Sequence, residues 1–380
     1  VRVGVVGAGI MGGSHAQRFQ KGEIARARLG AVCDIDPEKR AKWSGVPTFA
    51  SADELIASKT VDALVIATPH YAHTTIGIAG LKAGLHVLVE KPISVHKADC
   101  ERLIAAHRGR KQVFSAMFQM RTEPHYRRLR QLIRAGELGR IQRFNWIITN
   151  WFRSEAYYAS GGWRATWAGE GGGVLMNQCP HNLDMLQWLV GMPRRVRAFC
   201  QLGKYHNIEV EDDVTAYLEF PDGATGVFIT TTGEAPGTNR LEIGGTRGKI
   251  VLENGQLTFV RNEIPSDEFN RTTKGLFDKP PVWNVEVPVQ GSGGGHREIL
   301  QNYVDAILDG VPLIAPAAEG QASVELANAM LWSSLTGRTI EMPFSAAGFE
   351  RQLKRLIAGS RAKKGVRKDV VVNFESSFNR

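Results

Sequence analysis

The sequence predicts an α/β protein with two unlike parts, an N-terminal doubly wound domain and a C-terminal α+β domain with a large, mainly antiparallel open sheet. Up to about residue 120, short apolar strands alternate with helical stretches, a pattern typical of parallel sheets covered by helices. Between Arg195 and Arg261, strands follow one another across hairpin turns such as Asn254-Gly255. The 380 residues are enough for two cores. We expect domains at 1–121 and 122–345, and a basic extension at 346–380 that packs back on the body.

The elements of the first domain are expected in alternation. Strands are predicted at 1–6, 28–33, 61–68, 86–90 and 113–117, and helices at 11–21, 74–84 and 97–108. In the second domain, helices are predicted at 125–136, 297–310 and 319–335, and turns at 221–223, 244–248 and 254–255. Ligands of a doubly wound sheet bind at the carboxyl ends of its strands, so site residues are sought there.

Gly7, Gly9 and Gly12 form a G-x-G-x-x-G turn between the first strand and the first helix. Such glycines permit a tight turn and close approach of the backbone to a pyrophosphate at the helix N-terminus. Asp34 follows the second strand, where a carboxylate accepts hydrogen bonds from ribose hydroxyls and repels a 2′-phosphate. This order of elements predicts a Rossmann domain that prefers NAD to NADP, although Arg40 nearby weakens that preference; a cofactor-free relic is the alternative. The cofactor contacts expected at the turn are Gly7, Gly9, Ile10, Met11 and Gly12.

Lys91 stands in the segment HVLVEKPIS, at the end of a later parallel strand. The nicotinamide ring of a bound dinucleotide should lie at this edge. An ammonium there could bond a substrate hydroxyl and stabilise the alkoxide that develops as hydride departs. Pro92 restricts the backbone, and a cis Lys91-Pro92 bond would aim the lysine. A solvated strand-end charge is the ordinary alternative, and we expect a catalytic role.

The segment 171–191 places Asn177, His181 and Asp184 on one face of an expected helix. Pro180 should kink this helix or mark its first turn. Histidine titrates near neutrality and suits removal of a hydroxyl proton. Asp184 could orient His181 or, like Asn177, hold a substrate hydroxyl; a packed, hydrogen-bonded histidine is the alternative. A metal site using His181, Asp184 and Glu170 is not expected, because no second histidine stands at ligand spacing.

Tryptophans are concentrated between residues 146 and 188. Aromatic faces stack on the C–H faces of sugars, although core packing is their commoner role. Trp163 and Trp151 are the best candidates for a substrate contact. Arg164 could clamp a substrate hydroxyl or the nicotinamide carboxamide.

The net charge of +9 comes mainly from the C-terminal segment, since residues 350–369 hold eight Lys or Arg and two acids. A solvated helix face and tail is favoured over a nucleic-acid or membrane-surface contact, because aromatics are not interleaved with these charges. The cysteines form no C-x-x-C pair, which indicates reduced thiols in a cytoplasmic protein. The chain begins in its first strand, so no export leader is expected. Because the sequence lacks an initiator Met, a leader that has been removed is the alternative.

GAGIMG, ATPHYAH, AGLHVLVEKPIS, Trp163-Arg164 and GGG followed by His181-x-x-Asp184 resemble the Gfo/Idh/MocA family. The family is named for glucose–fructose oxidoreductase, inositol dehydrogenase and a rhizopine-catabolism protein. The resemblance covers nearly the whole chain and implies an open sheet that builds homo-oligomers, here a dimer or tetramer. The stretch 150–184 is most similar to members of the levoglucosan dehydrogenase and glycoside 3-dehydrogenase type.

The same resemblance implies roles for individual residues. Lys91 and His181 match the catalytic pair of the family. Asn177 departs from the Asp that many members carry four residues before the histidine, and Cys179 replaces a frequent Gly. Further cofactor contacts are expected at Thr68, Pro69, His73, Glu90, Lys91 and Gln119, and substrate contacts at Asn177, Asp184, Arg121, Trp163, Arg164 and Trp151.

The resulting hypothesis is an NAD(P)-dependent dehydrogenase that oxidises a secondary hydroxyl of a pyranose sugar, anhydrosugar or glycoside, with C3 as the candidate position. An NAD-dependent glycosidase that uses transient C3 oxidation is one alternative. A keto-sugar or inositol reductase-dehydrogenase is another, and an NAD(P)-sensing regulator is a third. Retention of both Lys91 and His181 argues against the regulator.

Overall fold

The first domain contains a parallel sheet, as predicted, and this sheet has six strands where five were expected. In this computed structural model, which describes residues 1–361, the strand order is β3-β2-β1-β4-β5-β6. The strands are β1 (Arg2–Val6), β2 (Arg28–Cys33), β3 (Thr48–Phe49), β4 (Ala63–Ile66), β5 (His86–Val89) and β6 (Phe114–Ala116). The helices are α1 (Ile10–Gln20), α2 (Pro37–Arg40), α3 (Ala52–Ala57), α4 (His70–Lys82) and α5 (Lys97–His107). The sequence analysis missed α2, β3 and α3, which are short, and α4 begins earlier than expected.

The second sheet has nine strands in the order β14-β13-β12-β11-β7-β10-β9-β8-β15. Its strands are β7 (Ile141–Ile148), β8 (Arg195–Leu202), β9 (Glu211–Glu219), β10 (Thr225–Thr231), β11 (Asn239–Gly245), β12 (Gly248–Glu253), β13 (Gln256–Asn262), β14 (Val282–Val285) and β15 (Ile340–Glu341). All neighbours pair antiparallel except β7 and β10, which are parallel. Burial alternates along β9, and Phe199 and Tyr217 are exposed, so one face of this sheet is packed and the other is open.

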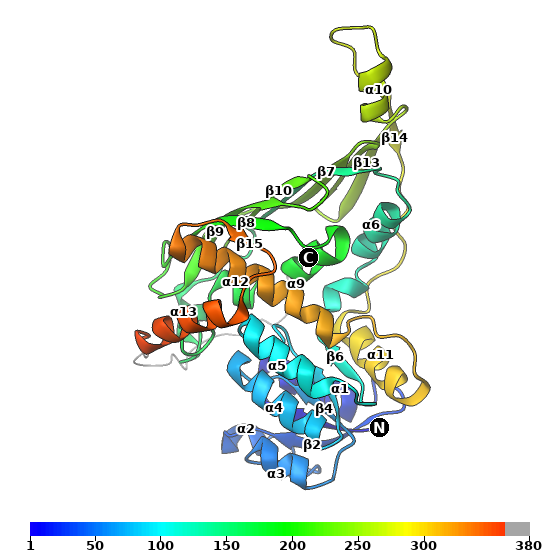
Figure 1. Cartoon of the computed structure of the whole chain (residues 1–380). Helices are drawn as coiled ribbons and strands as arrows, with labels where there is room; N and C mark the ends of the chain where they lie inside the picture. Colours follow the sequence, from blue (N-terminus) through cyan, green and yellow to red (C-terminus); the bar gives the residue numbers. More distant parts are fainter. Residues whose placement is uncertain (362–380) are drawn as a thin grey trace.

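Helices fill the space between the two sheets (Figure 1). These are α6 (Pro124–Arg134), α9 (Pro180–Val190) and α12 (Gly320–Thr336). Before α12, the chain returns to the first domain through α11 (Gly295–Asp309), where Tyr303 donates a hydrogen bond to the carbonyl of Leu64. The main-chain N–H of Ala116, in β6, also donates a hydrogen bond to the carbonyl oxygen of Ala315. Late segments of the chain therefore pack against the predicted first domain.

Helix α13 (Ala346–Ala358) forms the last described element and packs its apolar face inward through Phe349 and Leu353. Its Glu350 pairs with Arg102 of α5. Residues 346–361 thus pack against the body, whereas the rest of the predicted extension, residues 362–380, lies outside the described part of the chain.

The long segment 263–295 does not fold over the first domain. It carries α10 (Ser266–Thr272) and β14, and it projects from the far end of the large sheet (Figure 1). Leu276 and Phe277 near its tip are each 91% exposed. Among the described helices, none is long and apolar enough to cross a membrane. All four cysteines are free thiols.

The glycine turn offers a matched pair of substitutions. A Cβ at Gly12 would lie 1.7 Å from the carbonyl oxygen of Gly7, whereas a Cβ at Gly9 would meet no atom within 4 Å. We therefore expect Gly12→Ala to reduce stability and soluble yield, because the helix and turn must separate. Gly9→Ala should fold normally and raise the Kd for NAD, because its methyl group would enter the space that a pyrophosphate approaches. Thermal melts and NAD titration distinguish the two; equal melts for both variants would contradict this packing.

Candidate active site

The predicted turn and acid form the cofactor end of the site. Gly7 adopts a φ of +91° and donates its N–H to the carbonyl of Cys33. The Asp34 carboxylate accepts the N–H of Ala8 at 2.7 Å, so it is fixed beside the turn. Arg40 donates to the main-chain oxygen of Asp34. A fixed carboxylate at this position suits ribose hydroxyls and disfavours a 2′-phosphate.

The second predicted cofactor stretch follows β4. His73 is buried, and its ring nitrogens lie 2.8 Å from the carbonyl oxygens of Thr68 and Pro92. Burial lowers the pKa of His73, whereas the contacts with these two carbonyl groups raise it, and the ring links the two loops. His73 therefore shapes the site, while the Thr68 hydroxyl has no partner within residues 1–361. Pro69 precedes the first residue of α4.

Lys91 follows β5 and is joined to Pro92 by a cis peptide bond, in line with the expectation from sequence. Its Nζ donates to the carbonyl oxygen of Asn177 at 2.7 Å. Burial lowers the pKa of Lys91, and the charge of Glu90 opposes that shift. The ammonium is therefore held at a defined point by a hydrogen bond from the second domain.

Glu90 is buried and directly precedes Lys91 in the chain. Its Oε1 lies 2.7 Å from Nε2 of His15, and its Oε2 accepts the N–H of Lys91. Burial alone would raise the pKa of Glu90, but the hydrogen bond from His15 and the charge of neighbours including Lys91 lower it to about 2. Glu90 therefore contacts the main chain of Lys91, and its charge acts on the Lys91 ammonium through space. The sequence analysis missed His15, although a polar residue on the buried face of α1 is a pattern that could have identified it.

His181 lies in the first turn of α9 and is buried. Its Nε2 is 3.0 Å from the amide nitrogen of Gln119, and the edge of Phe118 packs against its ring. Burial lowers the pKa of His181 well below 6.5, and the charge of Lys91 acts in the same direction. The ring is thus neutral at physiological pH and within electrostatic reach of Lys91. Gln119, expected at the cofactor, contacts the histidine through its side-chain nitrogen.

The expected helix over 171–191 is two helices. Helix α8 (Val174–Asn177) ends before Cys179, and Pro180 is the first residue of α9. Of the two outcomes predicted for this proline, a kink or a place in the first turn, the structure shows the second. Asn177 consequently turns away from the shared face. Its side-chain nitrogen donates to Glu170 and its side-chain oxygen accepts from Tyr157, so the amide is engaged within the protein.

The glycines before α8 permit a close approach to β9. A Cβ at Gly173 would lie 1.9 Å from the carbonyl oxygen of Glu211. The buried carboxylate of Glu211 accepts the N–H groups of Gly173 and Leu175, which caps α8. Burial raises the pKa of Glu211 to about 7. The GGG stretch therefore fixes the position of α8, whose end carries the carbonyl that holds Lys91.

Arg121 and Asp184 pair with each other, contrary to their expected contacts with substrate. Arg121 donates to both carboxylate oxygens of Asp184, at 2.8 and 2.6 Å, and the two side chains are 1% and 0% exposed. Arg121 also pairs with Glu319, which is 47% exposed. Asp184 therefore does not orient His181. The pair instead fastens α9 to the segment after β6, because neither charge can remain buried alone.

Breaking this pair should be costly. Arg121→Met leaves Asp184 buried without a counter-ion, and we expect a loss of about 3–5 kcal/mol in unfolding free energy. Glu319→Gln is the matched control, because it removes a half-exposed partner and should cost less than about 1 kcal/mol. Urea denaturation measures both. An Arg121→Met protein as stable as wild type, but with a raised KM for its substrate, would instead indicate that Arg121 contacts the substrate.

Several aromatic side chains of the site lie around Arg164. Trp163 packs edge-on against His70, and the guanidinium of Arg164 lies 4.5 Å from the ring centres of both Trp163 and Tyr157. Trp151 packs against the core and has its indole N–H without a partner among the described residues. His70 and Tyr157 were not predicted from sequence. Both are polar residues beside motif residues, which is the signal that could have found them.

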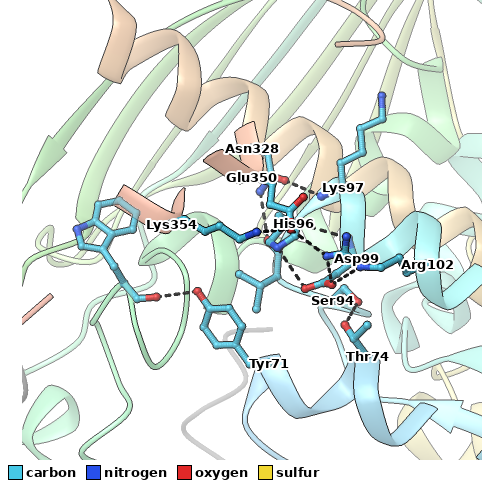
Figure 2. Close-up of polar contacts among 12 residues, drawn as sticks. Tyr71, Thr74, Ser94, His96, Lys97, Asp99, Arg102, Asn328, Glu350 and Lys354 are labelled. Carbon is cyan, nitrogen blue, oxygen red and sulfur yellow. Dashed lines mark hydrogen bonds and ion pairs between the residues drawn. The ribbon is translucent and has the colours of Figure 1, made fainter. Parts of the chain in front are cut away.

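The loop after Lys91 is anchored to the second domain (Figure 2). Asn328 of α12 accepts the N–H of Lys97 and donates to the carbonyl of Val95. The Lys97 ammonium lies 2.7 Å from a carboxylate oxygen of Glu325. At the start of α5, His96 accepts the N–H of Asp99 and caps the helix. Because both ends of the short loop are fixed, Lys91 has little freedom to move.

Several buried polar atoms at this edge have no partner within residues 1–361. They are Thr68 Oγ1, Gln119 Oε1, His15 Nδ1 and His181 Nδ1. Buried polar groups are normally hydrogen-bonded, so their concentration here indicates the place of a polar ligand. Together with the open space over Gly9, these atoms fit a nicotinamide dinucleotide lying from Asp34 toward Lys91.

Fold and site together define an NAD-dependent oxidoreductase. Residues 1–118 match the family model described as an oxidoreductase family with an NAD-binding Rossmann fold, and residues 126–251 match that of the GFO/IDH/MocA C-terminal domain. The chain belongs to the Gfo/Idh/MocA family of oxidoreductases.

Similar proteins act on polyols and sugars. Inositol 2-dehydrogenase 2 of Saccharopolyspora erythraea is 26% identical over 89% of this chain and 94% of its own length. Levoglucosan dehydrogenase of Pseudarthrobacter phenanthrenivorans is 23% identical over 90% of this chain and 98% of its own. The crystal structure of the WlbA dehydrogenase from Bordetella pertussis, in complex with NADH and UDP-GlcNAcA, superposes with a TM-score of 0.76 at 27% identity, covering 91% of this chain and 99% of that one.

Proposed function

We propose that this protein oxidises a secondary ring hydroxyl of a pyranose sugar, anhydrosugar or glycoside with NAD, and that the C3 hydroxyl is the first position to test. The observation that carries the proposal is the pairing of a buried ammonium, Lys91, with a buried neutral imidazole, His181, at the nicotinamide end of the site. Oxidation of an alcohol requires both a proton acceptor and a stabiliser of the developing oxyanion.

In this mechanism the residues divide two tasks. His181 accepts the hydroxyl proton while Lys91 donates a hydrogen bond to the same oxygen and stabilises its negative charge. When bound, NAD⁺ would supply the hydride acceptor, so that a secondary alcohol would give a keto sugar, NADH and one proton. The charge of Glu90 opposes the lowering of the Lys91 pKa by burial, and the carbonyl of Asn177 fixes the position of the ammonium. With the amide oxygen of Gln119 turned toward Nε2, the ring of His181 would keep its proton on Nε2 and accept the substrate proton at Nδ1, which has no partner among residues 1–361.

The substrate class is supported by the surroundings of the pair. Inositol and levoglucosan, named for the relatives, are both rings that carry several secondary hydroxyls. The rings of Trp163 and Tyr157 pack against Arg164, and the faces that the guanidinium leaves uncovered would suit the C–H faces of such a ring. We further propose a homo-oligomer formed through the open sheet face around Phe199, Leu202 and Tyr217, whose side chains are exposed.

Single substitutions test the two roles. Lys91→Ala and His181→Ala should each lower kcat by about 10²–10⁴-fold, because each removes one partner of the reacting oxygen. NADH absorbance across a panel of sugars and cyclitols gives the rates. Variants that turn over as fast as wild type would contradict the assignment. Release of an aglycone without net NADH would identify a glycosidase instead.

The pH dependence of oxidation should follow His181. Only the neutral imidazole accepts a proton, and burial lowers its pKa well below 6.5, so activity should persist through neutral pH and decline only on acidification below pH 6.5. The acid limb of kcat/KM against pH measures this. An acid limb above pH 6.5, or one that His181→Asn leaves in place, would exclude His181 as the base.

A further inference from the structure

Arg164 is held in a fixed orientation beside the site without a carboxylate partner. Its guanidinium carbon lies 4.5 Å from the centres of the Tyr157 and Trp163 rings, and Nη1 donates to the Tyr157 hydroxyl at 2.9 Å. Among residues 1–361, no Asp or Glu forms an ion pair with Arg164. Aromatic rings cover a face of the guanidinium, so its remaining N–H groups are presented along its edges.

A chain of contacts connects Arg164 to the proposed reacting centre. Tyr157 joins Arg164 to the side chain of Asn177, and the carbonyl of Asn177 accepts from Lys91. The charge of Arg164 also reaches Lys91, because it contributes to lowering the pKa of that ammonium. Arg164 therefore lies close enough to Lys91 for one ligand to contact both.

Glu170 is the carboxylate that acts on Arg164: burial raises the pKa of Glu170, and the charge of Arg164 opposes that shift. Its oxygens are already engaged in hydrogen bonds, since they accept the N–H of Ala165 and the side-chain nitrogen of Asn177. His70 adds no charge, because burial lowers its pKa well below 6.5.

We propose that Arg164 binds a carboxylate of the substrate, so that the sugar oxidised at Lys91 and His181 is a uronic acid or its glycoside. This inference rests on the proposed function and narrows its substrate class. A planar guanidinium forms two parallel hydrogen bonds with a carboxylate, and its orientation here is already set by the aromatic rings. A neutral sugar would leave the guanidinium without a carboxylate in direct contact.

The test uses sugar pairs that differ only in the proposed group. Methyl β-D-glucuronide and methyl β-D-glucoside carry a carboxylate and a hydroxymethyl at the same carbon, and galacto- and manno-configured pairs cover other ring geometries. With NAD⁺ and wild-type protein, we expect kcat/KM to favour the acidic member of the productive pair by roughly 10- to 100-fold, the effect of hydrogen bonds to a charged group. This preference should weaken as salt is added.

Substitution of Arg164 isolates its contribution. Arg164→Met keeps the length of the side chain without the charge, and it should bring the acid-to-neutral ratio close to one. Arg164→Lys keeps the charge without the planar fork, and it should give an intermediate ratio. Circular dichroism and NAD titration check that each variant folds; if Arg164→Met does not, the wild-type ratio and its salt dependence decide.

Other outcomes overturn the inference without touching the proposed function. Lys91-dependent oxidation of neutral sugars with no preference for the acid would do so. So would a preference for sugar phosphates, or an Arg164→Met protein whose only defect is a raised KM for NAD⁺, which would place Arg164 at the nicotinamide. Failure of every sugar and cyclitol to give NADH would instead contradict the proposed function itself.

Discussion

The burial of one ammonium group, that of Lys91, is the constraint on which the site depends. A buried charge is stable only with a counter-ion and satisfied hydrogen bonds. Glu90 supplies a negative charge in the first domain that raises the pKa of the ammonium, and the carbonyl of Asn177 supplies an acceptor from the second domain. His15 in turn keeps Glu90 ionised. Each of these groups has to be in place before Lys91 can hold its position beside the cofactor.

This requirement explains why the domains are tied together so close to Lys91. Asn328 and Glu325 of α12 fix the loop that follows Lys91. Arg121 and Asp184 fix α9, which carries His181, to the segment after β6. The two catalytic candidates come from different domains, yet each is fastened across the boundary by buried polar contacts. A rigid junction maintains their relative position.

The sequence predicted the parts of the site that depend on local order. The glycine turn, Asp34 and Lys91 follow from strands and turns in succession, and Pro180 marked the start of α9. Pairings across the fold could not be predicted in the same way. Helical spacing places Asp184 on a face with His181, but it does not reveal that Arg121 covers that carboxylate. The return of α11 to the first domain is likewise a matter of tertiary packing, since no local signal specifies which sheet a helix joins.

The most direct measurement is a crystal structure of the protein with NADH and an oxidisable sugar. The account predicts one sugar oxygen within about 2.6–3.2 Å of both Lys91 Nζ and a ring nitrogen of His181, the distance that proton transfer requires. The carbon bearing that oxygen should face the nicotinamide ring. A sugar whose oxygens reach only one of the two side chains, or a nicotinamide bound away from Lys91, would contradict it.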